Sequence, residues 1–351
     1  MLQRGCPETV PAPVLERLMN DSHANARRGL QLTGELVRVL SLLGERGIRA
    51  IPYKGPVLAS LLYGNLAQRE YVDLDLLVSP ARVADGKDAL LAAGYQPSLP
   101  LTARQEAALL RSNCELMFKN PERQSAVELH WHVAPGQFAV EFDFEELWER
   151  RRRISLGGSE VATLADEDLL LVLAVHAAKH LWECLCWTRD ISELVAARPG
   201  PDWERAVRRA QELGVLRFLL LSLDLSRELL GTPLPEMVGK AIAADPKVGA
   251  LAAAVRERMW AGESSGVSLG DHWLLLRARE RWRDKARYAR RLLFTPGVSE
   301  WKLLELPAPL WPLYPAIRVG RVVGKLVRGL WPRSASAAAT PLNQSPPPPR
   351  S

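Results

Sequence analysis

Two aspartates interrupt a stretch that otherwise has the composition of a buried strand. The segment VDLDLLV, residues 72–78, holds Asp73 and Asp75 two positions apart. Because side chains alternate across a strand, both aspartates are predicted to point to one face, while Val72 and its alternate neighbours point into a core. Adjacent carboxylates repel, which raises the pKa of one of them. A divalent cation relieves that repulsion, and Mg²⁺ is often held by one or two carboxylates plus substrate phosphates.

A second acidic strand is predicted downstream. In VELHWH, residues 127–132, the side chains of Glu128, His130 and His132 share a face. If this strand lies beside residues 72–78, Glu128 joins the two aspartates. Three carboxylates can hold two metal ions of the kind that clamp the attacking and leaving oxygens of a phosphoryl transfer. His130 is the nearer histidine to Glu128, and we expect it to support that acid rather than to react.

Basic residues upstream could meet phosphates. Lys54-Gly55 lies where a strand is expected to turn into a helix, and glycine there lets phosphate approach backbone amides at the helix start. Pro56 removes one such amide, so Lys54 is expected to contribute more than the amides. Arg69, four residues before Asp73, is the other candidate phosphate partner. From these residues alone, a solvent-exposed acidic face with ordinary surface cations remains open.

Hydrophobic periodicity places these residues in an α+β unit followed by helices. A helix is expected over 14–43, strands over 48–53, 72–78, 114–119 and 126–133, helices from 56 and over 81–93, and a hairpin over 153–164. Beyond it, helices are expected over 166–196, 202–230, 235–259 and 271–293. We therefore predict an N-terminal helical segment (1–46), a catalytic domain (47–164), a helical domain (165–332) and a disordered tail (333–351).

Composition narrows the setting without fixing the function. The chain has 351 residues, a formal charge of +6 and a pI of about 9.3, which suits a polyanionic partner or simply general solubility. No signal peptide or transmembrane run is recognisable, because the longest apolar run, 169–175, is far shorter than the ~20 residues that span a bilayer. The few, irregular cysteines predict no disulfide framework. We therefore expect a cytoplasmic protein.

Histidines and basic residues in the helical half allow more than one interpretation. His176, His180 and Cys184 suggest zinc, but on one helix the first and last lie about 12 Å apart, so packing against the catalytic domain on the acceptor side is favoured. Asp190 is either a local ion pair with Arg189 or a site residue. The basic amphipathic helix over 316–331 either touches an anionic membrane peripherally or docks on the helical domain, which we favour.

Taken together, these motifs resemble the bacterial uncharacterised nucleotidyltransferase family of the polymerase-β-like superfamily, and also the nucleotidyltransferase-type toxins of abortive-infection systems. The resemblance spans about residues 30–325. Its strongest part is Lys54-Gly55, Leu62-Tyr63-Gly64, Arg69, 73–78, Gly94-Tyr95 and 127–131, and a looser part includes His176, His180, Trp187 and Arg189-Asp190.

The resemblance implies a mixed sheet flanked by helices and a metal site. Asp73, Asp75 and Glu128 would be the metal-binding and catalytic acids, and Lys54, Gly55 and Arg69 would bind nucleotide phosphates. The implied reaction is Mg²⁺-dependent transfer of a nucleoside monophosphate from an NTP such as ATP to a hydroxyl. The acceptor, whether small molecule, peptide, protein or RNA, is open. The alternative is a catalytically degenerate member that binds a nucleotide or a protein.

Overall fold

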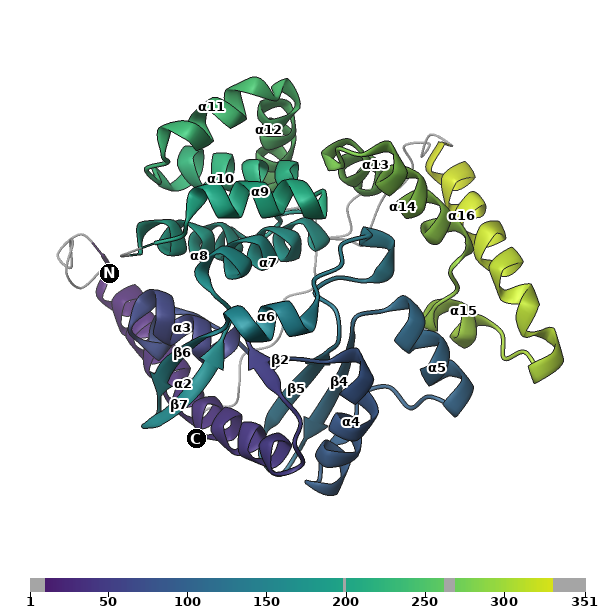
Figure 1. Cartoon of the computed structure of the whole chain (residues 1–351), viewed down its shortest axis with the longest axis horizontal. Helices are drawn as coiled ribbons and strands as arrows, with labels where there is room; N and C mark the ends of the chain where they lie inside the picture. Colours follow the sequence, from purple (N-terminus) through teal and green to yellow (C-terminus); the bar gives the residue numbers. More distant parts are fainter. Residues whose placement is uncertain (1–9, 198–199, 262–268, 331–351) are drawn as a thin grey trace, which may run out of the picture.

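The computed structural model describes residues 10–197, 200–261 and 269–330. Over these residues, five strands form a mixed sheet with helices packed around it, and a layer of helices lies above the sheet (Figure 1). The expected α+β class, with a helical C-terminal part, is confirmed. The expected tail, 333–351, lies outside the described residues.

The sheet has the strand order β1–β2–β5–β4–β3. Its strands are β1 (Ala50–Pro52), β2 (Leu74–Val78), β3 (Gln96–Pro97), β4 (Glu115–Asn120) and β5 (Ser125–His130). The central pair, β2 and β5, is parallel, and the other neighbours are antiparallel. The parallel pair therefore joins two segments that lie far apart in the chain, and it decides which side chains meet.

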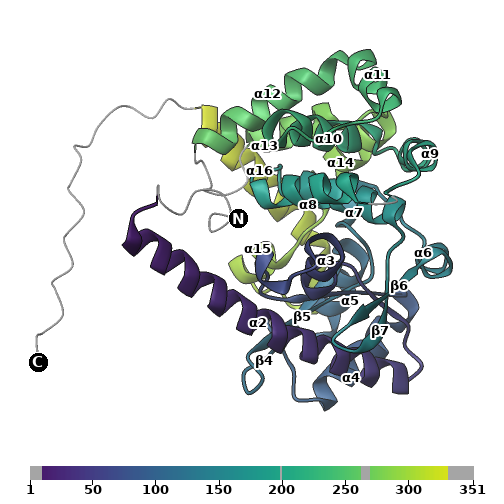
Figure 2. The ribbon, with the colours of Figure 1, turned by 90° about the vertical axis from the view of Figure 1, so that its left-hand side faces the viewer.

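The face of the sheet away from the acidic residues is covered by α2 (Ala12–Glu45) and α4 (Val83–Ala92), as Figure 2 shows for the long α2. Helical spacing places an apolar stripe of α2 on this face, and its side chains are fully buried. The stripe consists of Leu32, Leu36, Val39 and Leu43. Burial of one such leucine stabilises a fold by roughly 1.5–3 kcal/mol, so the stripe fixes α2 under the sheet.

The helical layer packs on the opposite side. It consists of α7 (Asp166–Lys179), α8 (Leu185–Ala196), α9 (Trp203–Leu213), α10 (Leu216–Leu230), α11 (Glu236–Ala244), α12 (Pro246–Ala261), α13 (Leu269–Ala278) and α14 (Trp282–Phe294). One hydrophobic core includes Leu77 of β2, Leu170 of α7 and Leu221 of α10. The helical part therefore roofs the sheet directly.

Shorter elements connect these layers. They are α3 (Gly55–Tyr63), α5 (Ala103–Ser112), α6 (Phe144–Arg150) and the hairpin of β6 (Arg152–Leu156) and β7 (Ser159–Thr163). The hairpin was predicted, whereas α5, α6 and β3 were not. Val72 corrects another expectation: β2 begins only at Leu74, and the Val72 side chain is 57% exposed rather than in a core.

The long helices expected in the C-terminal half are each divided in two. The helix expected over 166–196 ends at Lys179 and restarts at Leu185, because Leu181 and Trp182 take left-handed backbone angles with φ of 57° and 54°. Gly214, with φ 68°, ends α9 in the same conformation. These reversals bring the ends of successive helices beside each other.

The basic helix near the C-terminal end docks on the protein. In the described part of α16 (Tyr314–Leu330), Arg318 and Arg321 lie 3.3 and 2.9 Å from the buried carboxylate of Glu300 in α15 (Val298–Leu303). Arg318 also donates to the carbonyl of Leu292 in α14. These contacts favour docking over membrane contact for this part of 316–331. Within the described residues, no helix is both long and apolar enough to cross a membrane.

Candidate active site

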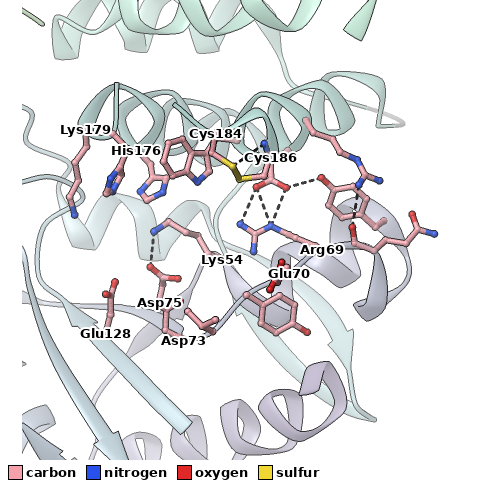
Figure 3. Close-up of a pocket in the computed structure, with 18 of the residues that line it drawn as sticks. Lys54, Arg69, Glu70, Asp73, Asp75, Glu128, His176, Lys179, Cys184 and Cys186 are labelled. Atoms are coloured by element: carbon pink, nitrogen blue, oxygen red, sulfur yellow. Dashed lines mark hydrogen bonds and ion pairs between the residues drawn. A yellow bond between two sulfur atoms is a disulfide. The ribbon is translucent and has the colours of Figure 1, made fainter. Parts of the chain in front are cut away.

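The floor of the site is set by the register of the parallel strands. Asp75 of β2 pairs directly with Glu128 of β5, so their side chains emerge side by side from one face of the sheet. Asp73 lies just before β2 and lines the same cavity, of about 600 Å³ (Figure 3). The structure thus brings together the three carboxylates that the sequence singled out.

Lys54 reaches this floor from the turn before α3. Its Nζ lies 2.7 Å from Oδ1 of Asp75, and its side chain is 10% exposed (Figure 3). Gly55 forms the turn with φ 57°, and a Cβ built there would lie 3.1 Å from the carbonyl oxygen of Asp73. The glycine therefore lets the turn lie against the backbone that carries Asp73.

His130 is a second cation built into the floor. Its buried ring places Nε2 3.2 Å from Asp75 and 3.3 Å from Glu128, and Nδ1 3.4 Å from Glu115. Burial alone would lower the pKa of His130, but Asp75, Cys114 and Glu128 raise it well above its ordinary value. For Asp75 the effects are reversed. Burial alone would raise the pKa of this carboxyl, but the positive charges of Lys54 and His130 outweigh burial and lower the pKa overall.

Asp73 behaves in the opposite way. Burial, with the negative charges of Asp75 and Glu128, raises the pKa of Asp73 to about 6. One of the two aspartates therefore holds its proton more tightly, which is the conflict expected from the sequence. A positive ion placed between these groups would lower that pKa, because it favours the ionised form.

A divalent cation fits the carboxylates of this cluster, whereas a protonated His130 has no lone pair to offer a metal ion. One ligand atom from each of Asp75, Glu128 and His130 lies within 4.8 Å of the others. Two of the three are carboxylates, the hard oxygen donors that Mg²⁺ prefers, and they open onto the cavity. Asp73 stands beside this group rather than within it.

Arg69 and Asp190 form a buried clamp across the cavity wall. Arg69 lies 3.0 Å from Asp190 of α8, and Tyr63 donates its hydroxyl to the same carboxylate at 2.8 Å (Figure 3). Asp190 therefore pairs with Arg69 and not with its neighbour Arg189. The guanidinium of Arg189 stacks over the ring of Tyr63 instead, 4.5 Å from its centroid.

The predicted packing role of the histidines in the helical half fits their positions. His176 of α7 and His180 just after it line the cavity roof with Trp187 of α8. Among the described residues, the groups with metal-ligand spacing include neither histidine. Cys184 forms a disulfide with Cys186 at the cavity edge, so it is not a thiolate ligand. This bond joins close neighbours and is no framework.

Two site residues were missed. Glu115 of β4 pairs in register with His130 of β5, and Lys179 at the end of α7 lies 2.8 Å from Glu115. Side-chain alternation along 115–119 could have predicted Glu115, because a charged residue at the start of a strand indicates which face of the strand is polar. No local signal places Lys179 there, since it depends on how α7 crosses the sheet.

Comparison with known proteins identifies the family. A family model described as uncharacterised nucleotidyltransferase matches residues 2–231. The chain belongs to this family. The match includes the whole sheet and extends through α10, so the family that the motifs predicted is confirmed.

A solved structure is also similar, though loosely. It is the crystal structure of the lincosamide antibiotic adenylyltransferase LnuA, lincomycin-bound, with 14% identity over 46% of this chain and 94% of that chain, and a TM-score of 0.31. A similarity at this level carries no argument about substrate. No curated protein matches the chain.

Proposed function

We propose that this nucleotidyltransferase-family protein transfers a nucleoside monophosphate from an NTP to a hydroxyl of an acceptor, with Mg²⁺ as cofactor. The observation that carries the proposal is the parallel register of Asp75 and Glu128, which puts two carboxylates beside Asp73 on the floor of a roofed cavity. A cluster of this kind is costly for a fold to bury without a counter-ion. It therefore supports a site that serves a metal and a polyphosphate.

Each residue has a role that follows from its position. The acceptor oxygen attacks the α-phosphorus, the bond to the bridging oxygen breaks, and pyrophosphate leaves with that oxygen. Glu128, which lines the cavity with its side chain 17% exposed, accepts the acceptor proton. Lys54, which contacts Asp75 on the cavity floor, donates to the phosphate oxygens. Asp73, Asp75 and Glu128 would hold Mg²⁺, which would supply positive charge for the triphosphate and favour ionisation of the acceptor hydroxyl.

Arg69 contributes through its place in the wall. Because its guanidinium is held by Asp190, its net effect on a phosphate is smaller than that of a free arginine. We propose that it orients the triphosphate through the side of the guanidinium that faces the cavity. Gly55 serves by keeping the turn close to Asp73, as its positive φ allows.

The test is pyrophosphate release. Purified protein with Mg²⁺ and each labelled NTP, with cell extract as the source of acceptor, is expected to release pyrophosphate and yield a labelled product. Asp73→Ala with Asp75→Ala should lower this rate at least about 100-fold. Glu70→Gln is the matched control, because Glu70 lines the same cavity, is exposed and lies outside the cluster. Activity that survives the double change removes these aspartates from the reaction.

A catalytically degenerate binding protein is the second candidate. One observation favours it: Lys54 and His130 already lie within ion-pair distance of Asp75, so this carboxylate has counter-charges without a metal ion. This candidate predicts that the protein binds an NTP, with or without Mg²⁺, and releases no pyrophosphate with any extract. Equilibrium dialysis with labelled NTP, run beside the pyrophosphate assay, separates the two.

A further inference from the structure

Three aromatic rings form a cluster in the roof that the proposed reaction does not use. The centroids of His176 and His180 lie 4.7 Å apart, and Trp187 lies 5.3 Å from the first and 5.0 Å from the second. All three line the cavity that holds Lys54 and the carboxylates. The chain reversal at Leu181 and Trp182 produces this cluster, because it folds the start of α8 back onto the end of α7.

The ring nitrogens of the cluster are available to a ligand. Among the described residues, no hydrogen-bond partner is found for the imidazole nitrogens of His176 and His180 or for the indole N–H of Trp187. The three side chains are only partly exposed, and the exposed part faces the cavity. Half-buried polar groups without partners need a ligand or water, since an unmade hydrogen bond in a buried place is costly.

The cluster is uncharged at neutral pH. Burial, followed by the positive charge of Lys54, lowers the pKa of His176 well below its ordinary value. Burial and Lys179 lower that of His180 to about 4. Neutral imidazoles are poor partners for phosphate, but each presents one hydrogen-bond donor and one acceptor beside a flat apolar surface. That combination matches a nucleobase, which is planar and has donors and acceptors on its edge.

We propose that His176, His180 and Trp187 form the nucleobase subsite of the cavity, with the base packed against the rings and the triphosphate extending down to Lys54. This inference rests on the proposed function and goes beyond it, because it names the residues that bind the base. Figure 3 shows His176 in the roof of the cavity and Lys54 below it, toward the carboxylates of the floor. Base recognition and phosphate binding are therefore separable by mutation.

The test compares two ligands in the presence of Mg²⁺. One is inorganic tripolyphosphate, and the other is whichever of the four common NTPs the wild-type protein binds most tightly. Isothermal titration calorimetry with the full chain measures both affinities. Trp187→Ala and His176→Ala are expected to weaken NTP binding about 5- to 150-fold, from a base-stacking contribution of ~1–3 kcal/mol. Tripolyphosphate binding should stay within about twofold, which also shows that the variants are folded. Trp187→Phe keeps a ring and should retain most NTP affinity.

Trp260→Ala is the matched control, because Trp260 of α12 is 75% exposed and outside the cavity. It should change neither affinity. An unchanged NTP affinity in Trp187→Ala overturns the inference and leaves the proposed function standing, with the rings then facing the acceptor. Parallel loss of both ligands, or wild-type affinity for tripolyphosphate equal to that for the NTP, overturns it as well. A wild-type protein that binds neither ligand overturns the inference and the proposed function together.

Discussion

At the scale of single residues, the floor of the cavity is a balance of buried charges. Asp75 is held ionised by Lys54 and His130, whereas Asp73 has its pKa raised to about 6. Asp75 is thus already paired with cationic side chains, whereas Asp73 has no cation in direct contact among the described ion pairs. A divalent ion would compete with Lys54 for the first and compensate the second, so Lys54 links metal binding to phosphate binding.

Replacement of Lys54 tests this competition. Lys54→Met leaves the buried carboxylate of Asp75 with only His130, so the free energy of unfolding is expected to fall by about 3 kcal/mol without Mg²⁺. Saturating Mg²⁺ should stabilise this variant more than the wild type, because no lysine occupies Asp75. Urea unfolding with and without Mg²⁺ measures both effects.

Lys87→Met is the control for that experiment. Lys87 pairs with Glu106 at 2.6 Å on the far side of the sheet, with both side chains about a quarter exposed. Its loss should cost less than about 1 kcal/mol and respond to Mg²⁺ as the wild type does. Equal Mg²⁺ stabilisation of Lys54→Met and wild type would show that Lys54 does not compete with the ion.

The glycines at the two ends of α3, Gly55 and Gly64, allow the effect of backbone strain to be distinguished from an effect on the reaction. Gly55→Ala places a Cβ 3.1 Å from the carbonyl oxygen of Asp73 and forces alanine to a φ of 57°. Gly64→Ala at the other end of α3 meets the same backbone strain, with φ 60°, but no atom within 4 Å. Both should lower the free energy of unfolding by about 1–2 kcal/mol.

Only Gly55→Ala is expected to lower pyrophosphate release, by about tenfold or more, because it displaces the backbone of Asp73. Initial rates at equal amounts of folded protein measure the difference. A Gly64→Ala variant that loses activity to the same extent would mean that strain in α3, and not the contact with Asp73, governs the rate.

Side-chain alternation explains which site residues the sequence could reveal. It was enough to put Asp73 and Asp75 on one face and to pick Glu128 from its strand. It could not show that Val72 lies outside β2, because the strand ends where pairing ends, and pairing is a long-range property. Nor could it show that Asp190 chooses Arg69 over its neighbour, since that depends on where α8 begins.

At the scale of elements, α2 is joined to the sheet by a polar contact as well as by its leucines. Glu35 is buried on this helix and accepts hydrogen bonds from Arg38 at 2.7 Å and from the hydroxyl of Tyr95. Burial would raise the pKa of Glu35, but these partners outweigh it and lower the pKa below 4.5. The ionised carboxylate therefore belongs to the native contact.

The pH dependence of stability follows from that shift. A carboxyl with a depressed native pKa stabilises the fold above its unfolded pKa, and this contribution is lost as pH falls from about 4.5 through the native value. Glu35→Gln should therefore lower the free energy of unfolding by about 1–3 kcal/mol at pH 7 and by less at pH 3.

Chemical denaturation at the two pH values measures this change. Glu45→Gln, at the exposed end of α2, is the control and should stay within about 0.5 kcal/mol of wild type at both. A Glu35→Gln deficit that is the same at pH 3 and pH 7 would show that the side chain acts by its shape and hydrogen bonds rather than by its charge.

Elements differed in how well periodicity predicted them. The long N-terminal helix and the hairpin at 153–164 were found because each has one clear apolar face and a glycine turn. The expected helix over 166–196 was too long, since Leu181 and Trp182 take a left-handed conformation that their types disfavour. The parallel pairing of β2 with β5 also lies beyond local patterns, because it joins strands far apart in sequence.

At the scale of the whole molecule, the cavity exists only while the helical roof stays on the sheet. The clamp of Arg69 and Asp190 holds the segment before β2 against α8, with the two side chains 12% and 1% exposed. Trp187 lies one turn before Asp190 on the same helix. The clamp therefore fixes both the wall of the site and the proposed base subsite.

Breaking the clamp from either side should separate stability from binding. Asp190→Asn leaves the guanidinium of Arg69 buried without its counter-charge, at an expected cost of about 3–5 kcal/mol in unfolding free energy. Adding Arg69→Met removes that charge, so the double variant should be more stable than Asp190→Asn alone and the two changes non-additive. Its NTP affinity should nevertheless stay reduced, because α8 has lost its attachment to the floor and the triphosphate has lost the guanidinium of Arg69. Chemical denaturation measures the unfolding free energies, and calorimetry measures NTP affinity at a temperature where both variants are folded. Wild-type affinity in the folded double variant would contradict this prediction. It would show that the clamp only stabilises the fold and that packing of the roof alone positions Trp187.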